Sequence, residues 1–169
     1  CDYVPDTIRG ITPDSFKFYG VRIGVNQFDG TTKDKLLFPF TNGNEIVGNT
    51  VRLLAEKHFW SIGETRDADM FGWARAKKIG GNLFITEGEL DCVSYAELYP
   101  TWPVVSLPSG AAGAKKAIQK NLEFLQGYSE IVLWFDADEA GQKAAGEAAS
   151  VLPPSKAYIA RLEAYKDLS

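Results

Sequence analysis

The chain has few of the side chains from which proteins build disulfide networks and zinc sites. Its 169 residues include two cysteines, Cys1 and Cys92, and one histidine, His58. Two distant cysteines make a disulfide framework implausible, and the single histidine adds too little for a Cys-rich zinc site. We therefore expect a protein of a reducing compartment such as the cytoplasm.

Long apolar runs are also absent. None approaches the roughly 20 residues that a membrane span requires, so no membrane role is expected. With 45% hydrophobic and 24% charged residues, the composition is that of a globular protein of one domain or two small units. The chain begins at Cys1 rather than Met, so we expect a piece of a longer protein.

The charge is distributed unevenly. The net charge of −4 does not by itself indicate nucleic-acid binding, but residues 1–80 carry +1 and residues 81–169 carry −5. Such a division fits a phosphate-holding unit beside a metal-holding unit. Uneven surface decoration explains the same numbers equally well.

Residues 1–80 have the pattern of a small α+β unit. Thr12 and Pro13 predict the start of a short helix that ends before Gly20. Strands and turn signals follow it, and the pattern is typical of an antiparallel meander. The expected strands are residues 21–28, 35–40 and 45–54, with one more helix at 67–78 and a seam at Gly80–Gly81.

Residues 81–169 have a different pattern of expected secondary structure. Short apolar strands alternate with helices, which predicts an α/β fold with a mostly parallel four-stranded sheet flanked by helices on both faces. The expected strands are 82–86, 103–107, 130–135 and 156–162, and the expected helices are 88–99, 112–126 and 139–152.

Acidic residues follow two of these strands directly. Glu87 comes after the first strand, and Asp136 and Asp138 come after the third. Ligands of open parallel sheets bind at the carboxyl ends of the strands, where these acids and Asp167 are expected. Converging carboxylates raise one another's pKa unless a divalent cation neutralises them, and oxygen-only ligands favour Mg²⁺ or Mn²⁺.

A simpler interpretation of Asp138 stays open. An Asp between a strand and a helix is often an N-cap, and Asp138 precedes an expected helix. The stretch DADEAGQKAAGE also imitates a calcium-binding EF-hand loop, but Ala140 replaces a ligand and a strand stands where that motif needs a helix. We therefore exclude calcium. The chain also has neither a GxxxxGK[ST] phosphate loop nor a GxSxG nucleophile elbow.

The acids occur in two related motifs, TEGELD after the first strand and FDADEAG after the third. This pairing resembles the Toprim family. From about Arg9 onward, the chain also resembles the RNA-polymerase domain of primase–helicases of the T-seven-like phages. Four further stretches of the sequence occur in the same order as in that domain. More distantly the chain is similar to bacterial replicative primases and to the mitochondrial helicase Twinkle. The stretches are RGITPDSFKFYGV, LLFPFTNGNEIVGNTVR, PVVSLPSGAAGAKKA and a late KD.

The resemblance gives counterparts for five acids and implies roles for four of them. Glu87 matches the Toprim glutamate, a metal ligand or a proton-transfer group near the primer hydroxyl. Asp136 and Asp138 match the metal-binding pair, and Asp167 matches a later acid of the phage proteins. Asp91 matches the acid four residues after the glutamate, without an assigned role.

The resemblance also implies a function. The chain would be the catalytic core of a DNA primase, with an N-terminal subdomain (1–80), a Toprim subdomain (81–169) and an active site between them. It would make RNA primers on a single-stranded DNA template from ribonucleoside triphosphates with Mg²⁺ or Mn²⁺, in the cytoplasm of a bacterial host, or in the mitochondrial matrix if Twinkle-like. A zinc-binding module and a replicative helicase domain are the expected neighbours. Candidate nucleotide-binding residues are Arg52, Lys57, Arg66, Lys115, Lys116 and Lys143. For each lysine taken singly, a solvated surface charge is the simpler interpretation.

Several aromatic residues have two interpretations. Phe59 and Trp60 beside Lys57, and Trp73 near Arg75, can stack on template bases or belong to the core. Phe38, Phe40 and Trp134 lie in expected strands and are assigned to packing. Alternative functions are a non-catalytic Twinkle-like DNA-binding module and a Toprim nuclease. A topoisomerase is least compatible with the short chain.

Overall fold

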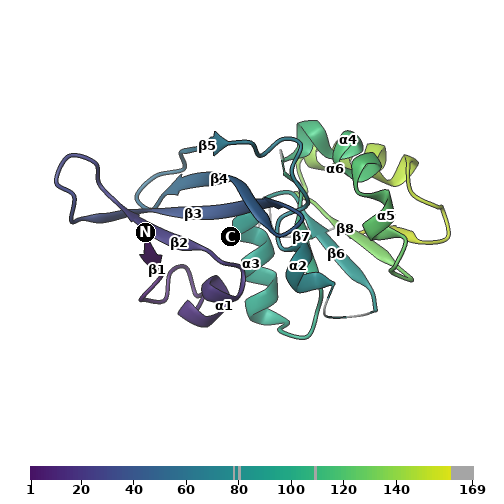
Figure 1. The fold of residues 1–169 in the computed structure, drawn as a ribbon. Helices are drawn as coiled ribbons and strands as arrows, with labels where there is room; N and C mark the ends of the chain where they lie inside the picture. Colours follow the sequence, from purple (N-terminus) through teal and green to yellow (C-terminus); the bar gives the residue numbers. More distant parts are fainter. Residues whose placement is uncertain (78, 80, 109, 161–169) are drawn as a thin grey trace. The chain divides into compact units, whose positions relative to one another are not determined.

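The computed structural model describes residues 1–77, 79, 81–108 and 110–160 (Figure 1). The chain divides into two compact units, Cys1–Asp69 and Met70–Ser169. Gly80, the first residue of the Gly80–Gly81 boundary predicted from the sequence, lies outside the described residues. No helix within the described ranges is long and apolar enough to cross a membrane.

The first unit is built on a five-stranded antiparallel sheet with the strand order β1-β2-β3-β4-β5. One short helix, α1, lies between β1 and β2 in the chain. Pro13 begins it and Gly20, with φ +72°, follows its end, as the sequence predicts. The elements are β1 (Asp2–Tyr3), α1 (Pro13–Phe18), β2 (Arg22–Val25), β3 (Lys33–Asn42), β4 (Glu45–Leu53) and β5 (Phe59–Gly63).

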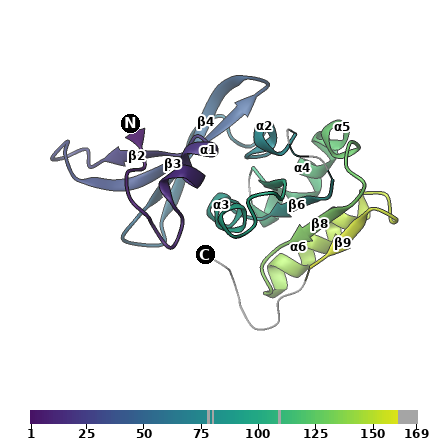
Figure 2. The same ribbon diagram turned by 90° about the horizontal axis from the view of Figure 1, so that it is seen from below.

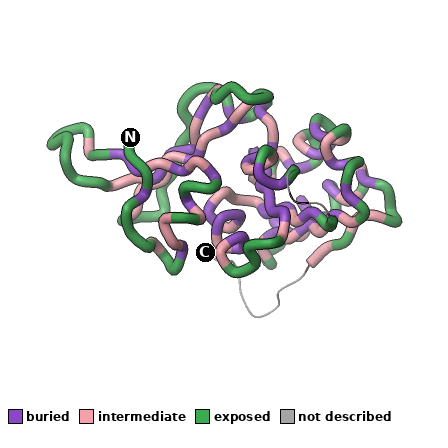
Figure 3. Tube along the Cα trace, turned by 60° about the horizontal axis from the view of Figure 1, so that its bottom comes forward, coloured by how far each residue is buried: buried purple, intermediate pink, exposed green. Residues whose placement is uncertain are grey.

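The core of the first unit lies on one face of this sheet. Leu36, Phe38 and Phe40 alternate along β3 and are each 1% exposed, which confirms that both phenylalanines pack in the interior. Phe16 of α1 is fully buried as well. In contrast, every residue of the edge strand β5 is exposed. Figure 3 shows the buried residues in the interior of each unit and the exposed ones mainly along its loops.

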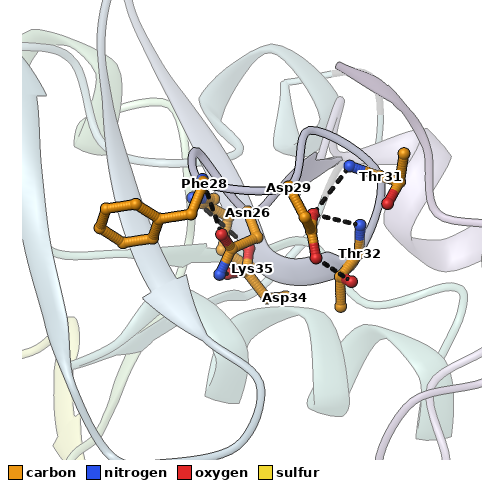
Figure 4. A network of polar contacts seen from close by, with 7 residues as sticks. All are labelled: Asn26, Phe28, Asp29, Thr31, Thr32, Asp34 and Lys35. Carbon is orange, nitrogen blue, oxygen red and sulfur yellow. Dashed lines mark hydrogen bonds and ion pairs between the residues drawn. The ribbon is translucent and has the colours of Figure 1, made fainter.

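A network of polar contacts orders the loop between β2 and β3 (Figure 4). The Asp29 carboxylate accepts hydrogen bonds from the backbone N–H groups of Thr31 and Thr32 and from the Thr32 hydroxyl. The Asn26 side chain accepts from the N–H of Phe28 and donates to Asp34. The loop therefore holds its conformation through local side-chain bonds, while the Phe28 ring remains 89% exposed.

The second unit contains a four-stranded parallel sheet with the order β7-β6-β8-β9, which confirms the predicted α/β architecture. The connections between its strands carry helices, and α6 lies along β8 and β9 in Figure 2. The elements are α2 (Trp73–Ala76), β6 (Leu83–Thr86), α3 (Glu89–Leu98), β7 (Val104–Ser106), η1 (Ala111–Gly113), α4 (Ala114–Lys120), α5 (Leu122–Leu125), β8 (Ile131–Trp134), α6 (Glu139–Ser150) and β9 (Ala157–Ile159).

Alternation along the strands assigns the helices to opposite faces of the parallel sheet. Leu83 and Ile85 point into a buried cluster that contains Ile118 of α4 and Ala145 of α6. Phe84, between them, points to the other face, where its ring stacks on Trp102 at 4.3 Å. The helix α3 packs on β6 and β7. Both faces of the sheet are therefore covered, as a parallel sheet requires.

Two helix expectations need correction. The helix expected at 112–126 is divided into η1, α4 and α5. The break between α4 and α5 falls at the buried Asn121, whose side-chain amide donates back to the Ala117 carbonyl. Such local side-chain bonds compete with a continuous helix. The helix expected at 67–78 is a single turn, Trp73–Ala76, which begins after Gly72 with φ +82°.

Candidate active site

The carboxyl ends of β6 and β8 bring Glu87 and Asp136 together. These strands are parallel neighbours, with Thr86 opposite Trp134 at their ends. Glu87 is the next residue after β6, and its Oε1 accepts a hydrogen bond of 2.9 Å from the backbone N–H of Asp136. Both residues are half-buried. The strand ends thus hold two acids from distant parts of the chain at one edge of the sheet.

Asp138 lies at the start of α6 and is exposed. It is the N-cap of this helix, since its Oδ1 accepts a hydrogen bond of 2.7 Å from the N–H of Gly141. The simple interpretation of Asp138 as a cap is therefore correct. A cap bond occupies one carboxylate oxygen and leaves the other able to bind a ligand. The cap and ligand roles are chemically compatible.

Gly141 allows α6 to approach the acids closely. A Cβ at this position would stand 2.3 Å from the Asp136 carbonyl oxygen and 2.6 Å from Glu87 Oε1. No other residue type fits there without a shift of the backbone. Sequence reasoning did not single out Gly141. Its place three residues after Asp138, in the stretch DADEAG, was the available signal.

A second side chain of α6 holds the acidic loop. Gln142 donates a hydrogen bond of 3.0 Å from its Nε2 to the carbonyl oxygen of Asp136. Together with the Asp138 cap, this bond fastens residues 136–138 to the first turn of α6. The backbone around the acids is consequently fixed by α6 and by Glu87.

Electrostatics shows that these carboxylates affect one another. Burial raises the pKa of Glu87 above its ordinary 4.5, and the negative charges of Asp138 and Asp91 raise it further. The N–H of Asp136 acts in the opposite direction. Asp91 lies in the first turn of α3, where the helix N-terminus favours a negative charge. A Cβ at Gly88 would be 3.6 Å from its Oδ2.

The donor chemistry of this edge fits a divalent cation. Glu87, Asp91, Asp136 and Asp138 offer only oxygen atoms, the ligands that Mg²⁺ and Mn²⁺ prefer. Burial is the main cause of the raised pKa of Glu87, and the charges of Asp138 and Asp91 add to it, a repulsion that a bound cation would relieve. Within residues 1–77, 79, 81–108 and 110–160, however, no three ligand side chains are grouped closely enough to hold a metal ion. Side chains that now bond to the backbone would have to turn toward the cation.

Asp167 and the candidate nucleotide-binding residues differ in their position and exposure. Asp167 lies outside the described residues. Arg52 is half-buried on β4, whereas Lys57 and Arg66 are exposed in the first unit. The other three lysines are exposed on helices of the second unit: Lys115 and Lys116 on α4, and Lys143 on α6.

The aromatic residues with two interpretations differ in exposure. Phe59 is 61% exposed and Trp60 37% exposed on β5, so neither belongs to the core. Trp73 packs edge-on against Phe124, with Lys77 Nζ 4.2 Å from its ring centre. Trp134 stacks on Tyr95 at 3.8 Å, in agreement with its assignment to packing.

Residues 84–169, about half of the chain, match the family described as Toprim-like. Over 111 residues the chain is 40% identical to the DNA helicase/primase of Enterobacteria phage T3, a match that covers 63% of this chain and 19% of that protein. The chain therefore spans about a fifth of the length of this relative.

Solved structures show the same likeness. The primase fragment of the bacteriophage T7 primase–helicase protein is 36% identical, with a TM-score of 0.82, and the match covers 94% of this chain and 64% of that one. A DNA primase domain from Pseudomonas aeruginosa, 17% identical, has the same fold with a TM-score of 0.69 over 94% of this chain and 63% of that one. The chain therefore belongs to the Toprim-like family, and over most of its length it is similar to the primase fragment of the phage T7 primase–helicase.

Proposed function

We propose that this chain is the catalytic core of a DNA primase, a nucleotidyltransferase that makes short RNA primers on single-stranded DNA. The observation that carries the proposal is the joining of Glu87 to Asp136 at the carboxyl edge of β6 and β8, beside Asp138. Family membership and the likeness to phage primases support it.

The proposal assigns chemistry to the acids. Glu87, Asp136 and Asp138 would hold Mg²⁺ or Mn²⁺, with Asp167 as a further ligand and Asp91 as an additional acid of the site. Such a cation, when bound, offsets the negative charge of a nucleotide's phosphates. Glu87, with its raised pKa, is suited to accept the proton of a primer hydroxyl.

The proposal also assigns the nucleotide's triphosphate to basic side chains. Arginine and lysine neutralise phosphate oxygens, and their charge strengthens each hydrogen bond. Arg52 is the candidate whose half-buried position on β4 gives it the most defined surroundings. The other candidates are exposed and can reach a ligand only from the surface: Lys57, Arg66, Lys115, Lys116 and Lys143.

Partners and location follow from the relatives. Single-stranded DNA and ribonucleoside triphosphates would be the template and substrates, and a helicase domain would act with the core, as the name of the phage T3 relative suggests. A zinc-binding module is a further proposed neighbour. Action in the cytoplasm of an infected bacterium fits a phage protein. None of the relatives described above favours the mitochondrial alternative.

The decisive test is extension of a supplied diribonucleotide on a single-stranded DNA template with labelled ribonucleotides and Mg²⁺ or Mn²⁺. A supplied primer bypasses any zinc-binding module. We expect extension by the native chain and none by Asp136→Asn or Glu87→Gln. Glu123→Gln, an exposed change on α5, is the matched control and should extend normally.

Other outcomes separate the alternatives. Template binding without extension would contradict a self-sufficient polymerase and favour a non-catalytic DNA-binding module. Metal-dependent nicking of the template, lost in Asp136→Asn, would favour the Toprim nuclease.

A further inference from the structure

The outer side of β5 is an open edge of the antiparallel sheet. β5 is the last strand of that sheet, and within the described residues no strand pairs with its outer side (Figure 1). All of its residues are exposed, and its large side chains are apolar: Phe59 is 61% exposed, Trp60 37% and Ile62 53%. An exposed apolar edge strand is a template for pairing with a further strand.

β5 also lacks the features that protect edge strands from pairing. Proteins protect such edges with very short strands, lysine, proline or β-bulges. The β5 sequence, FWSIG, contains neither a charge nor a proline, and its register with β4 has no shift. The opposite edge of the same sheet is β1, which has only two residues. The sheet is therefore protected at β1 and open at β5.

The backbone groups of β5 alternate in the direction they face. The Leu53 N–H donates to the His58 carbonyl at 3.0 Å, and the Glu64 N–H donates to the Val47 carbonyl at 2.9 Å. Because bonded and non-bonded pairs alternate in an antiparallel ladder, the even-numbered residues of 58–64 direct their backbone groups to β4. Three residues direct their N–H and carbonyl groups away from the sheet: Phe59, Ser61 and Gly63.

These outward-facing residues are complementary to a second copy of themselves. When two β5 strands run antiparallel with Ser61 opposite Ser61, Phe59 lies opposite Gly63, so every outward-facing residue meets another. An aromatic ring opposite an edge glycine compensates for the side chain that the glycine lacks. On the other face Trp60 lies opposite Ile62, an aromatic and β-branched pair of the kind that stabilises sheets.

The charges beside β5 follow the same symmetry. His58 and Glu64 lie three residues to either side of Ser61, and Glu56 and Arg66 lie five residues to either side. All four of these flanking side chains are exposed. In the antiparallel arrangement each acid is directed toward a hydrogen-bond donor of the other copy, which favours this partner over an unrelated strand.

We propose that β5 is a self-association surface, at which two copies of this chain join their antiparallel sheets about Ser61. The paired segment has five residues, so the dimer is weak and reversible, in the class of interfaces below about 1,200 Å². The inference uses residues of the first unit alone and does not depend on the proposed primase function.

The first test is sedimentation velocity of the 169-residue chain across a wide range of concentration. We expect the native sedimentation coefficient to rise with concentration. Ser61→Lys brings like charges face to face at the symmetry axis, so this variant should remain a monomer where the native chain dimerises. Ser61→Ala is the matched control, because it also loses the 3.2 Å hydrogen bond from the Thr65 hydroxyl but adds no charge. It should associate as the native chain does.

A disulfide crosslink tests the register. Opposed residues of a hydrogen-bonded antiparallel pair have Cα atoms about 5.5 Å apart, within the range that a disulfide spans. The exposed Cys1 is first replaced by serine, whereas Cys92 is buried. In that background Ser61→Cys should form a disulfide-linked dimer on mild oxidation. Glu45→Cys, an exposed position at the start of β4, is the control and should not.

Three outcomes overturn the inference. The first is a native chain that stays monomeric at every concentration, and the second is a Ser61→Lys chain that associates as the native chain does. If Ser61→Lys lowers the melting temperature, the crosslink decides, and the absence of a dimer in Ser61→Cys overturns the inference. A monomeric native chain whose affinity for single-stranded DNA falls in Phe59→Ala would assign the strand to nucleic acid instead.

Discussion

The Glu87 side chain is bonded to the backbone of Asp136, 49 residues later in the chain, through a hydrogen bond of 2.9 Å to Glu87 Oε1. This bond crosses from the end of β6 to the end of β8 and joins the two Toprim motifs. It also uses one oxygen of the carboxylate, so Glu87 has the other available for a ligand. The Glu87 carboxylate also lies close to the Cα of Gly141.

Gly141→Ala should damage both the fold and the site. Its Cβ would overlap the Asp136 carbonyl oxygen and Glu87 Oε1, at 2.3 and 2.6 Å. Overpacking of this kind typically costs about 1–3 kcal/mol, so we expect a lower free energy of unfolding in urea and weaker Mn²⁺ binding.

Gly146→Ala is the matched control on the same helix. A Cβ at Gly146 meets nothing within 4 Å. Alanine is favoured over glycine in a helix interior by up to about 1 kcal/mol, so this change should stabilise the chain slightly. Equal behaviour of the two variants would contradict the close-approach argument.

Two substitutions of Asp138 should separate its cap role from its proposed ligand role. Asp138→Ala removes the bond to the Gly141 N–H and should cost about 1 kcal/mol of unfolding free energy. Asp138→Asn keeps a side-chain oxygen that can cap, so its stability should stay near that of the native chain while Mn²⁺ binding falls. Urea unfolding and metal titration measure the two effects. Undiminished Mn²⁺ binding by Asp138→Asn would leave the residue with its cap role alone.

The raised pKa of Glu87 predicts a pH dependence of stability in metal-free solution. The folded chain holds the Glu87 proton more tightly than the unfolded chain, whose pKa is near 4.5. Stability contributed by this proton is fully present below 4.5 and is lost as the pH rises through the raised pKa. Glu87→Gln carries no such proton and should flatten this part of the curve of unfolding free energy against pH. An unchanged curve would show that Glu87 titrates alike in both states.

Asp29 should show the opposite sign. The Thr32 hydroxyl, followed by the N–H groups of Thr31 and Thr32, lowers the pKa of Asp29 from 3.8 to about 2. Its contribution to loop stability is therefore present above 3.8 and lost as the pH falls toward 2. In an NMR titration, Thr32→Val should move the pKa of Asp29 back toward 3.8, whereas Thr32→Ser, which keeps the hydroxyl, should not. A Thr32→Val chain that still titrates near the native value would assign the shift to the backbone alone.

Local patterns in the sequence determined the class of the second unit and the edge at which its acids lie. Alternating apolar strands and helices require a parallel sheet covered on both faces, and acids that directly follow such strands must lie at its carboxyl edge. Glu87 and Asp136 therefore meet as the sequence predicts. The sequence also predicted the cap role of Asp138, because helix capping depends on neighbouring residues alone.

The edge strand β5 could not be predicted from the sequence pattern. All its residues are exposed, so no alternation of buried and exposed side chains marks it. Its pairing with β4 forms through backbone bonds that any sequence can make.

Only the tertiary structure decided the contacts between distant segments. The stacking of Tyr95 on Trp134 and the approach of Gly141 to Glu87 join elements that come together only when the sheet and its helices pack. Such contacts depend on the register of β6 against β8 and on the depth at which α3 and α6 settle. Local propensity contains no information on either quantity, because both arise from close packing of the whole unit.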